Sequence, residues 1–282
     1  IKHLAHNNVE VNAVSRSNKE NSKFVTWHQA DLLDLTQIEN LIVKTKPSHL
    51  LHLAWFVKPG QYWESEINKD WLNASKHLVD TFYKHSGERF VGIGTCAEYD
   101  WNGSGICEET KTLLNPTTLY GKSKLALFNY LLSQNMNFAW GRLFHNFGPG
   151  ESQERLVPSV ILNLLRNEPA ECTHGRQIRN FLYVEELAKA LIEILVEKVN
   201  GPINIGSSDN ISIGTLVCLI GSTMQKTDLI RLGALPQRAN DPMKLIPSIS
   251  KLHNEVGWKS SLSLRDGIIR TIRWWENFFS NH

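Results

Sequence analysis

A tyrosine and a lysine four residues apart form the pair with the clearest chemical potential in this 282-residue sequence. Tyr120 and Lys124 lie in the segment Tyr-Gly-Lys-Ser-Lys, where helical spacing of apolar residues begins. On a helix, residues four apart lie on one face, one turn from each other. The lysine charge is expected to lower the pKa of the phenol, which makes the tyrosine an acid or base near neutral pH. The pair predicts the proton exchange that accompanies hydride transfer at an alcohol carbon.

A Tyr-x-x-x-Lys pair alone is common, with a packed tyrosine and an exposed lysine, so the interpretation depends on its context. Phe90 to Thr95 reads as a strand, and the Thr95 hydroxyl at its end could bind a substrate oxygen. Cys96 follows and could be an extra acid or nucleophile, although a small apolar filler is the favoured interpretation. Thr95, Tyr120 and Lys124 are therefore the predicted catalytic residues, and Thr95 and Cys96 are predicted substrate contacts.

The elements that must position these residues alternate between strand and helix in the first half of the chain. Strands are predicted over 9–15, 24–29, 49–55, 90–95 and 137–144, and helices over 35–44, 66–84 and 120–134. This alternation predicts right-handed crossovers, a mostly parallel sheet, and ligands at the carboxyl ends of the strands.

The regular alternation of predicted strands and helices ends after Pro149. Helices are predicted over 157–166, 184–196, 213–224 and 264–279, with one short strand over 202–205. Ser263, with Asp266 three residues later, is a plausible cap for the last helix. We therefore expect a dinucleotide-binding domain over 1–149. Residues 150–282 would form a mostly substrate-binding part, with some segments returning to the sheet.

Short motifs in order along nearly the whole chain resemble the extended short-chain dehydrogenase/reductases of the NAD-dependent epimerase/dehydratase family. They are Asp31-Leu32, His52-Leu53-Ala54, Thr95 to Tyr99, Pro116 to Lys124, Gly141-Arg142 with Asn146 to Pro149, Arg179 to Val184, Asn204 to Gly206, and Leu252 to Trp258. Each motif is weak, and their order carries the resemblance. It implies an α/β fold, a Rossmann-like doubly wound parallel sheet with a smaller mixed C-terminal part, and an enzyme that modifies nucleotide sugars.

The resemblance also implies binding roles. Near the cofactor it places Asp31 and Leu32 against the adenine, Leu53, Ala54 and Trp55 at a strand end, and Tyr120 and Lys124 at the nicotinamide ribose. Asn146 and Arg179 would position the nucleotide diphosphate, with Arg238 as a further candidate. For His145, a proton donor and a packed, hydrogen-bonded histidine are both open.

The strand predicted over 9–15 ends in Ser15-Arg16-Ser17 and carries no acidic residue to bind the ribose 2′-hydroxyl of NAD. Serine and arginine suit a 2′-phosphate instead, so Ser15 and Arg16 are predicted cofactor contacts. NADP(H) is therefore preferred and NAD(H) is possible. The alternative is that Arg16 is a solvated loop cation.

The sequence departs from the family at its start. The family begins with a strand and a Gly-x-x-Gly-x-x-Gly turn that binds the cofactor pyrophosphate, whereas the first glycine here is Gly60. We therefore expect about 15–25 further residues upstream of Ile1, enough for a strand, a turn and a helix start. The alternative is a non-catalytic family member that lacks the cofactor loop.

Family members that eliminate water carry Asp-Glu directly after the catalytic threonine, whereas this chain has Cys96-Ala97. A dehydratase is therefore not expected. The preferred prediction is a 4-ketoreductase that acts on a nucleoside-diphosphate keto-sugar, and the alternative is a 4-epimerase that retains its cofactor.

Composition is ordinary for a globular enzyme, with 41% hydrophobic and 21% charged residues and a net charge of +2. Nucleic acid and membrane partners are not expected, since no apolar stretch approaches the ~20 residues that span a bilayer. The four cysteines have no metal-binding spacing, so a reduced, cytoplasmic protein without a metal site is predicted. The resemblance implies a homodimer through the Tyr-Lys helix, whose apolar residues must pack somewhere: Leu125, Leu127, Phe128 and Leu131.

Overall fold

The computed structural model describes residues 4, 9–102, 105–134, 136–237 and 241–280. Its contacts divide the chain into two units, each assembled from three stretches. The first takes in Ile1–Glu98, Pro116–Arg142 and Ala188–Ile203, and the second takes in Tyr99–Asn115, Leu143–Leu187 and Asn204–His282. Both units therefore draw on both halves of the sequence. The assignment of cofactor binding to 1–149 and substrate binding to 150–282 stays a prediction.

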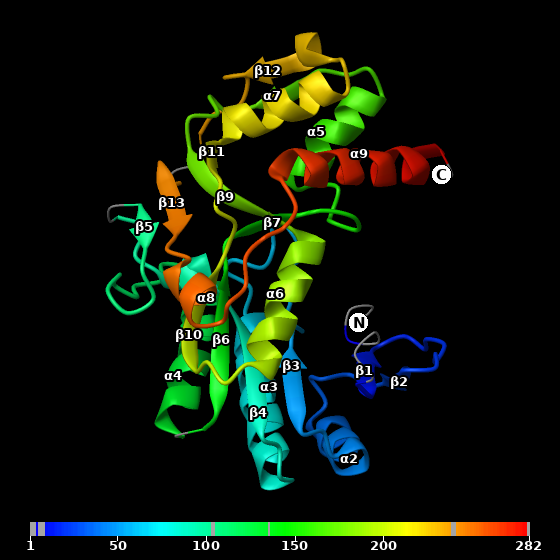
Figure 1. The fold of residues 1–282 in the computed structure, drawn as a ribbon, viewed down its shortest axis with the longest axis vertical. Coiled ribbons are helices and arrows are strands. Elements are labelled where there is room, and N and C mark those ends of the chain that lie inside the picture. The colour runs from blue at the N-terminus through cyan, green and yellow to red at the C-terminus, as the bar shows by residue number, and fades with distance from the viewer. Residues whose placement is uncertain (1–3, 5–8, 103–104, 135, 238–240, 281–282) are drawn as a thin grey trace. The chain divides into compact units, whose positions relative to one another are not determined.

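The first unit is built on two sheets. A two-stranded parallel sheet pairs β1 (Val11–Ser15) with β2 (Val25–Gln29). A four-stranded sheet has the order β10 (Gly201–Ile205), β6 (Phe138–Leu143), β4 (Arg89–Thr95) and β3 (His49–His52) (Figure 1). All seven residues of β4 are buried, as expected for a strand covered on both faces. The predicted α/β class with parallel strand pairing is confirmed.

Helices α2 (Leu35–Thr45), α3 (Ile67–Lys84) and α4 (Leu119–Ser133) pack side by side in this unit. The Asp34 carboxylate caps α2 by accepting from the amides of Thr36 and Gln37, and the helix ends at Lys46, just before Pro47. A fourth helix, α6 (Val184–Val196), crosses in front of the strands in the view of Figure 1. On α4, the apolar residues Leu127, Phe128 and Leu131 are buried within the chain. Their packing therefore needs no second copy, and the homodimer stays a prediction.

Two glycines let β4 and β6 approach closely. A Cβ at Gly92 would lie 2.5 Å from the Trp140 ring on β6, and one at Gly94 would lie 2.2 Å from Trp140 Nε1. Contacts this short do not occur, so β4 can pass the buried Trp140 only without side chains at these positions. The strand then delivers Thr95 at its carboxyl end, followed by a 3₁₀ turn over Cys96–Glu98.

The second unit contains a five-stranded sheet and a small parallel pair. The order of strands in the larger sheet is β11 (Asn210–Ser212), β9 (Ile178–Tyr183), β13 (Lys244–Pro247) and β5 (Ile106–Cys107). Its fifth strand, β7 (His145–Phe147), also pairs with β9. The pair is β12 (Ile230–Leu232) with β8 (Ala170–Cys172).

Helices α5 (Leu156–Leu165), α7 (Ile213–Thr223) and α9 (Leu264–Ser280) enclose the core of the second unit, where Ile161, Leu216 and Trp275 are buried. A short helix, α8 (Ser250–Asn254), and a 3₁₀ turn over Thr227–Leu229 complete the elements. The predicted cap of the last helix is confirmed. Ser263 Oγ accepts from the Asp266 amide at 3.1 Å and donates to Asp266 Oδ2 at 2.6 Å.

Boundaries differ from the sequence-based expectation at one end that matters for the site. The strand predicted over 49–55 ends at His52, so Leu53, Ala54 and Trp55 lie in the loop that follows.

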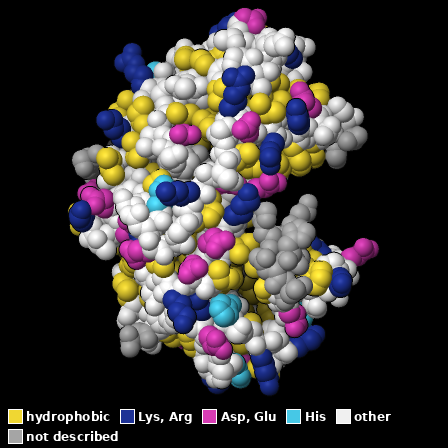
Figure 2. Space-filling view, in the orientation of Figure 1, with side chains coloured by type: hydrophobic (Ala, Val, Ile, Leu, Met, Phe, Trp, Pro, Cys, Tyr) yellow, Lys and Arg dark blue, Asp and Glu magenta, His cyan; other side chains and the backbone are white. Residues whose placement is uncertain are grey.

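The surface carries no large field of one sign on the face drawn in Figure 2, where basic and acidic side chains are interspersed. Among the described residues, no helix combines the length and apolar character that crossing a bilayer requires.

Candidate active site

The ammonium of Lys124 is buried inside the first unit. The side chain is 3% exposed, and its Nζ donates to the Ile93 carbonyl at 2.8 Å. The same nitrogen lies 3.8 Å from the centre of the Trp55 ring, a close cation–π contact. Gly121 lets the helix approach the strand end, because a Cβ there would lie 2.5 Å from the Ala97 carbonyl oxygen.

Tyr120 begins the same helix and meets Thr95. The Thr95 side chain lies close enough to the Tyr120 phenol to lower its pKa. The Tyr120 amide donates to the Trp63 carbonyl at 2.9 Å, and its ring lies edge-on to Tyr62 at 4.9 Å between centroids. The structure thus brings together Thr95 and Tyr120 and places Lys124 one turn along the same helix, as the sequence predicts.

Burial controls the electrostatics of the pair. It lowers the pKa of Lys124 to about 7, against an opposing contribution from the Glu98 carboxylate. Burial also raises the pKa of Tyr120, helped by the proximity of Tyr62, and the neighbouring Thr95 side chain only partly counters it. The pKa of this phenol is therefore raised rather than lowered as expected from Lys124, because desolvation is the largest contribution.

Trp55 is tied to the loop that precedes α3. Its indole Nε1 donates to Asn68 Oδ1 at 2.8 Å, and Asn68 Nδ2 donates to the carbonyls of Tyr62 and Ser65. One buried amide therefore fixes both the ring above Lys124 and the loop that carries Tyr62. The sequence pointed to Trp55 but gave no sign of Asn68, whose role depends on contacts between non-neighbouring residues.

Glu98 was not singled out as a site residue by the sequence. Its side chain is fully buried, and its carboxylate accepts from the Thr95 amide at 2.8 Å and from Arg142 Nε at 2.7 Å. An acidic residue at the end of a wholly buried strand was the available signal, because a buried carboxylate requires partners.

The other predicted cofactor contacts lie at the ends of β1, β2 and β3. Arg16 is exposed after β1, and Asp31 Oδ1 accepts from the Leu33 amide at 3.0 Å. Leu32 packs against the apolar cluster between α2 and α3. Leu53 is 58% exposed directly after β3. These residues fit a cofactor at the carboxyl ends of the strands. In the described structure, no contact joins Arg16 or Asp31 to Tyr120 or Lys124.

The predicted diphosphate contacts belong to the second unit. Asn146 is exposed on β7. Arg179 on β9 is 2% exposed, and its Nη2 donates to Asp241 Oδ1 at 2.5 Å, a partner that the sequence analysis missed. Beside Arg179, burial lowers the pKa of His145 to about 3, so this ring is neutral and its proton-donor interpretation is not supported. Arg238 lies outside the described residues.

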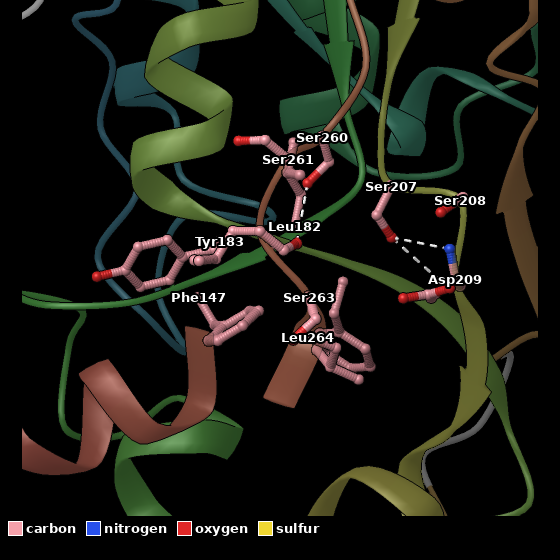
Figure 3. A pocket seen from close by; sticks show the side chains of 12 residues that line it. Phe147, Leu182, Tyr183, Ser207, Ser208, Asp209, Ser260, Ser261, Ser263 and Leu264 are labelled. Carbon is pink, nitrogen blue, oxygen red and sulfur yellow. Dashed lines mark hydrogen bonds between the residues drawn. The ribbon is translucent and has the colours of Figure 1, made fainter. Parts of the chain in front are cut away.

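A small cavity of about 150 Å³ also lies in the second unit, lined by serines from two loops (Figure 3). Ser207 and Ser208 line it from one loop, and Ser260, Ser261 and Ser263 line it from the segment that leads into α9. None of the predicted site residues lines this cavity.

Comparisons with known proteins identify the family of the chain. A family model described as "NAD dependent epimerase/dehydratase family" matches residues 1–206. The dTDP-glucose 4,6-dehydratase of Escherichia coli is 25% identical over 308 residues, which cover 94% of this chain and 83% of the relative. The chain therefore belongs to the NAD-dependent epimerase/dehydratase family.

Solved structures share the fold. The UDP-glucose 4-epimerase of Thermotoga maritima, solved with UDP-glucose, has a TM-score of 0.86 at 18% identity and covers 99% of this chain and 94% of its own. The Bordetella bronchiseptica enzyme WbmG, solved with NAD and UDP, has a TM-score of 0.84 at 18% identity, with 98% and 90% covered. The Rossmann-like architecture expected from the sequence is confirmed.

Proposed function

We propose that the protein catalyses hydride transfer at carbon four of a nucleoside-diphosphate sugar, with a ketoreductase as the first candidate. The observation that carries this proposal is the proximity of the Thr95 and Tyr120 side chains, one turn from the buried ammonium of Lys124. Proton transfer at a substrate oxygen requires such an arrangement, with one group to hold the oxygen and another to exchange the proton.

A bound nicotinamide cofactor would supply or accept the hydride. Thr95 and Tyr120 would bind the oxygen on the reacting carbon, and the Tyr120 phenol would donate or accept the proton. Lys124 would add positive charge beside the phenol and donate to the nicotinamide ribose. Cys96, which is buried next to Thr95, would contact the sugar through its apolar surface.

The proposed contacts of the cofactor are Ser15, Arg16, Asp31, Leu32, Leu53, Ala54 and Trp55. Arg16 supports NADP(H), because its exposed guanidinium follows a strand end without an acidic residue. Structural neighbours solved with NAD support the other cofactor. Calorimetric titration with NADPH and NADH decides between them, and Arg16→Ala should weaken NADPH binding selectively.

Asn146 and Arg179 are the proposed contacts of the nucleotide diphosphate. Arg179 can present a planar fork of donors to a phosphate, but Asp241 already occupies one arm of that fork. Arg179→Met should therefore weaken the binding of UDP or dTDP without changing the affinity for the nicotinamide cofactor.

A 4-epimerase is the second candidate, favoured by the high TM-score to a UDP-glucose 4-epimerase. A dehydratase is disfavoured despite the dTDP-glucose 4,6-dehydratase relatives, because Cys96 and Ala97 supply neither an acid nor a base for removing water.

The test is a set of UDP- and dTDP-linked hexoses and 4-keto-hexoses, incubated with the protein and each cofactor. Oxidation of NADPH with a keto-sugar identifies a reductase, and interconversion of hexoses without net cofactor turnover identifies an epimerase. Tyr120→Phe should lower either rate by about 10²- to 10⁴-fold. Tyr130→Phe is the matched control, since Tyr130 lies on the same helix but donates to Asp80. Cofactor binding without turnover of any of these sugars would contradict the proposal.

A further inference from the structure

We propose that Glu98 is a positioning residue of this site, which holds the backbone of Thr95 and fixes a negative charge close to Lys124. This inference rests on the proposed hydride-transfer function, and no residue of the Thr95, Tyr120 and Lys124 set performs this role.

The carboxylate of Glu98 is saturated by donors from the strand end. Oε1 accepts from the Thr95 amide at 2.8 Å and from Trp140 Nε1 at 3.0 Å. Oε2 accepts from Arg142 Nε at 2.7 Å, and both Glu98 and Arg142 are fully buried. The Thr95 amide is therefore held by a side chain that is itself fixed from the neighbouring strand.

The strand is shaped to admit this carboxylate. A Cβ at Gly94 would lie 2.5 Å from Glu98 Oε1 and 2.2 Å from Trp140 Nε1. A buried ion pair seldom stabilises a fold more than apolar residues of similar volume would. Glu98 and Arg142 are thus better explained by the group they hold, which is the backbone amide of Thr95, the residue beside the Tyr120 phenol.

The charge of Glu98 also acts on Lys124. Two titratable groups interact with the charge of Lys124: Glu98 from the 3₁₀ turn and His52 from β3. Burial lowers the pKa of His52 to about 3, and its Nε2 is hydrogen-bonded to Ser75 at 2.9 Å, so His52 is neutral. Of these two groups, Glu98 is the one that favours the charged form of Lys124, and it counters the desolvation that favours a neutral Lys124.

Two variants separate the effect of the Glu98 charge from the effect of its hydrogen bond with the Thr95 amide. Glu98→Gln keeps the length of the side chain and an acceptor for the Thr95 amide but removes the charge. Glu98→Asp keeps the charge and withdraws the carboxylate from that amide. Arg89→Lys is the matched control for stability, because Arg89 is a buried charge in the same unit whose hydrogen bonds lead to Asn137, Asn200 and the end of α6.

The measurement that does not require turnover is a pH titration of lysine side chains labelled with ¹³C at Cε, followed by NMR. The Lys124 signal is assigned by its loss in Lys124→Met. In Glu98→Gln, the Lys124 midpoint should move to lower pH by at least about half a pH unit, because its stabilising anion is gone. It should stay near the wild-type value in Glu98→Asp and in Arg89→Lys.

The kinetic measurement is the pH profile of kcat and KM with the sugar that turns over. In Glu98→Gln, kcat should fall about tenfold, and the loss should grow as pH rises, because Lys124 then loses its proton earlier. Glu98→Asp should lower kcat at all pH values without moving the profile. KM should change less than about threefold in both, because Glu98 does not touch the substrate.

An unchanged Lys124 midpoint in Glu98→Gln, with a rate loss no greater than that of Arg89→Lys, would overturn the role of Glu98. If no nucleotide sugar turns over, the proposed function fails by itself. The Lys124 titration then still decides whether Glu98 controls this lysine.

Discussion

Lys124 shows most clearly how the site departs from what the core alone would require. A lysine that is 3% exposed loses most of its hydration. Three interactions of the folded protein compensate for that loss: the hydrogen bond to the Ile93 carbonyl, the contact with the Trp55 ring and the nearby charge of Glu98. Lysine is seldom buried without such partners, and strongly shifted titrations concentrate at functional sites. The environment of this one side chain is therefore the best internal support for an active site in the first unit.

The lowered pKa of Lys124 predicts a pH dependence of stability. The folded protein releases the Lys124 proton near pH 7, and the unfolded chain releases it near about pH 10.4. Between these values the unfolded chain binds more protons, so the free energy of unfolding should rise with pH across this window and be unaffected below it. Urea unfolding of wild type and Lys124→Met at several pH values measures the effect as a difference. A difference that stays flat or falls with pH would contradict the buried, shifted ammonium.

Residue type and spacing pointed to Thr95, Tyr120 and Lys124 as a candidate set, because a short helix start fixes the distance between two of them. The partners of these residues were not predictable in the same way. Glu98 meets Arg142 across 44 positions, and Arg179 meets Asp241 across 62. Such pairs depend on which strands become neighbours, and a single sequence does not state this.

The contact between β4 and α6 depends on Arg89, at the start of the strand that ends in Thr95. Its guanidinium donates to the carbonyls of Ile194 and Leu195 in the last turn of α6 and to the Val199 carbonyl beyond it. A single cation thereby satisfies several carbonyls that a helix end leaves without partners.

Arg89→Lys should lower the free energy of unfolding by about 1–3 kcal/mol, because the three donors of an ammonium cannot satisfy all the acceptors that the planar guanidinium binds. Chemical denaturation measures this change, with the exposed Arg265→Lys as the control. Equal stability of the two variants would show that the buried network contributes nothing.

Asn180 explains a departure from the Arg-Asp-Phe segment that the chain otherwise resembles. Its Nδ2 donates to the carbonyls of Ser207 and Asp209, while its Oδ1 accepts from the Ser207 amide at 2.8 Å. An aspartate could accept that amide but would face the two carbonyl oxygens without a donor.

Asn180→Asp should therefore destabilise the protein by about 2–4 kcal/mol, and more at neutral than at acid pH, where the carboxyl regains a proton to donate. Thermal unfolding at both pH values tests this. A stable Asn180→Asp at neutral pH would show that the loop after β10 does not need the amide.

At the scale of elements, the long helices and the central strands followed from periodicity and caps, as at Asp34 and Ser263. Short strands such as β5, β7 and β13 were not predicted, because two to four residues carry too little pattern to read. The end of β3 was predicted too late for a similar reason. The run of apolar residues continues through Trp55, although the hydrogen bonds between strands stop at His52.

On the scale of the whole molecule, each unit has a core of its own, so ligand effects can be followed in each separately. A nicotinamide cofactor at about 100 times its Kd should raise the free energy of unfolding by about 2.7 kcal/mol. Hydrogen exchange should slow mainly at the ends of β1, β3 and β4, whereas UDP or dTDP should protect β7 and β9. Protection of β7 and β9 by the cofactor alone would contradict this assignment of roles.

The central claim is that Thr95, Tyr120 and Lys124 carry hydride transfer to or from a nucleotide sugar. Its most direct test is a single-turnover experiment that follows the near-ultraviolet absorbance of reduced nicotinamide when the cofactor-loaded protein meets UDP- or dTDP-linked hexoses and their 4-keto forms. The account predicts a transient or lasting absorbance change with at least one of these sugars, slowed about 10²-fold or more in Tyr120→Phe and unaltered in Tyr130→Phe. An absorbance change of equal rate in Tyr120→Phe, or none in a wild-type protein that binds both cofactor and sugar nucleotide, would contradict it.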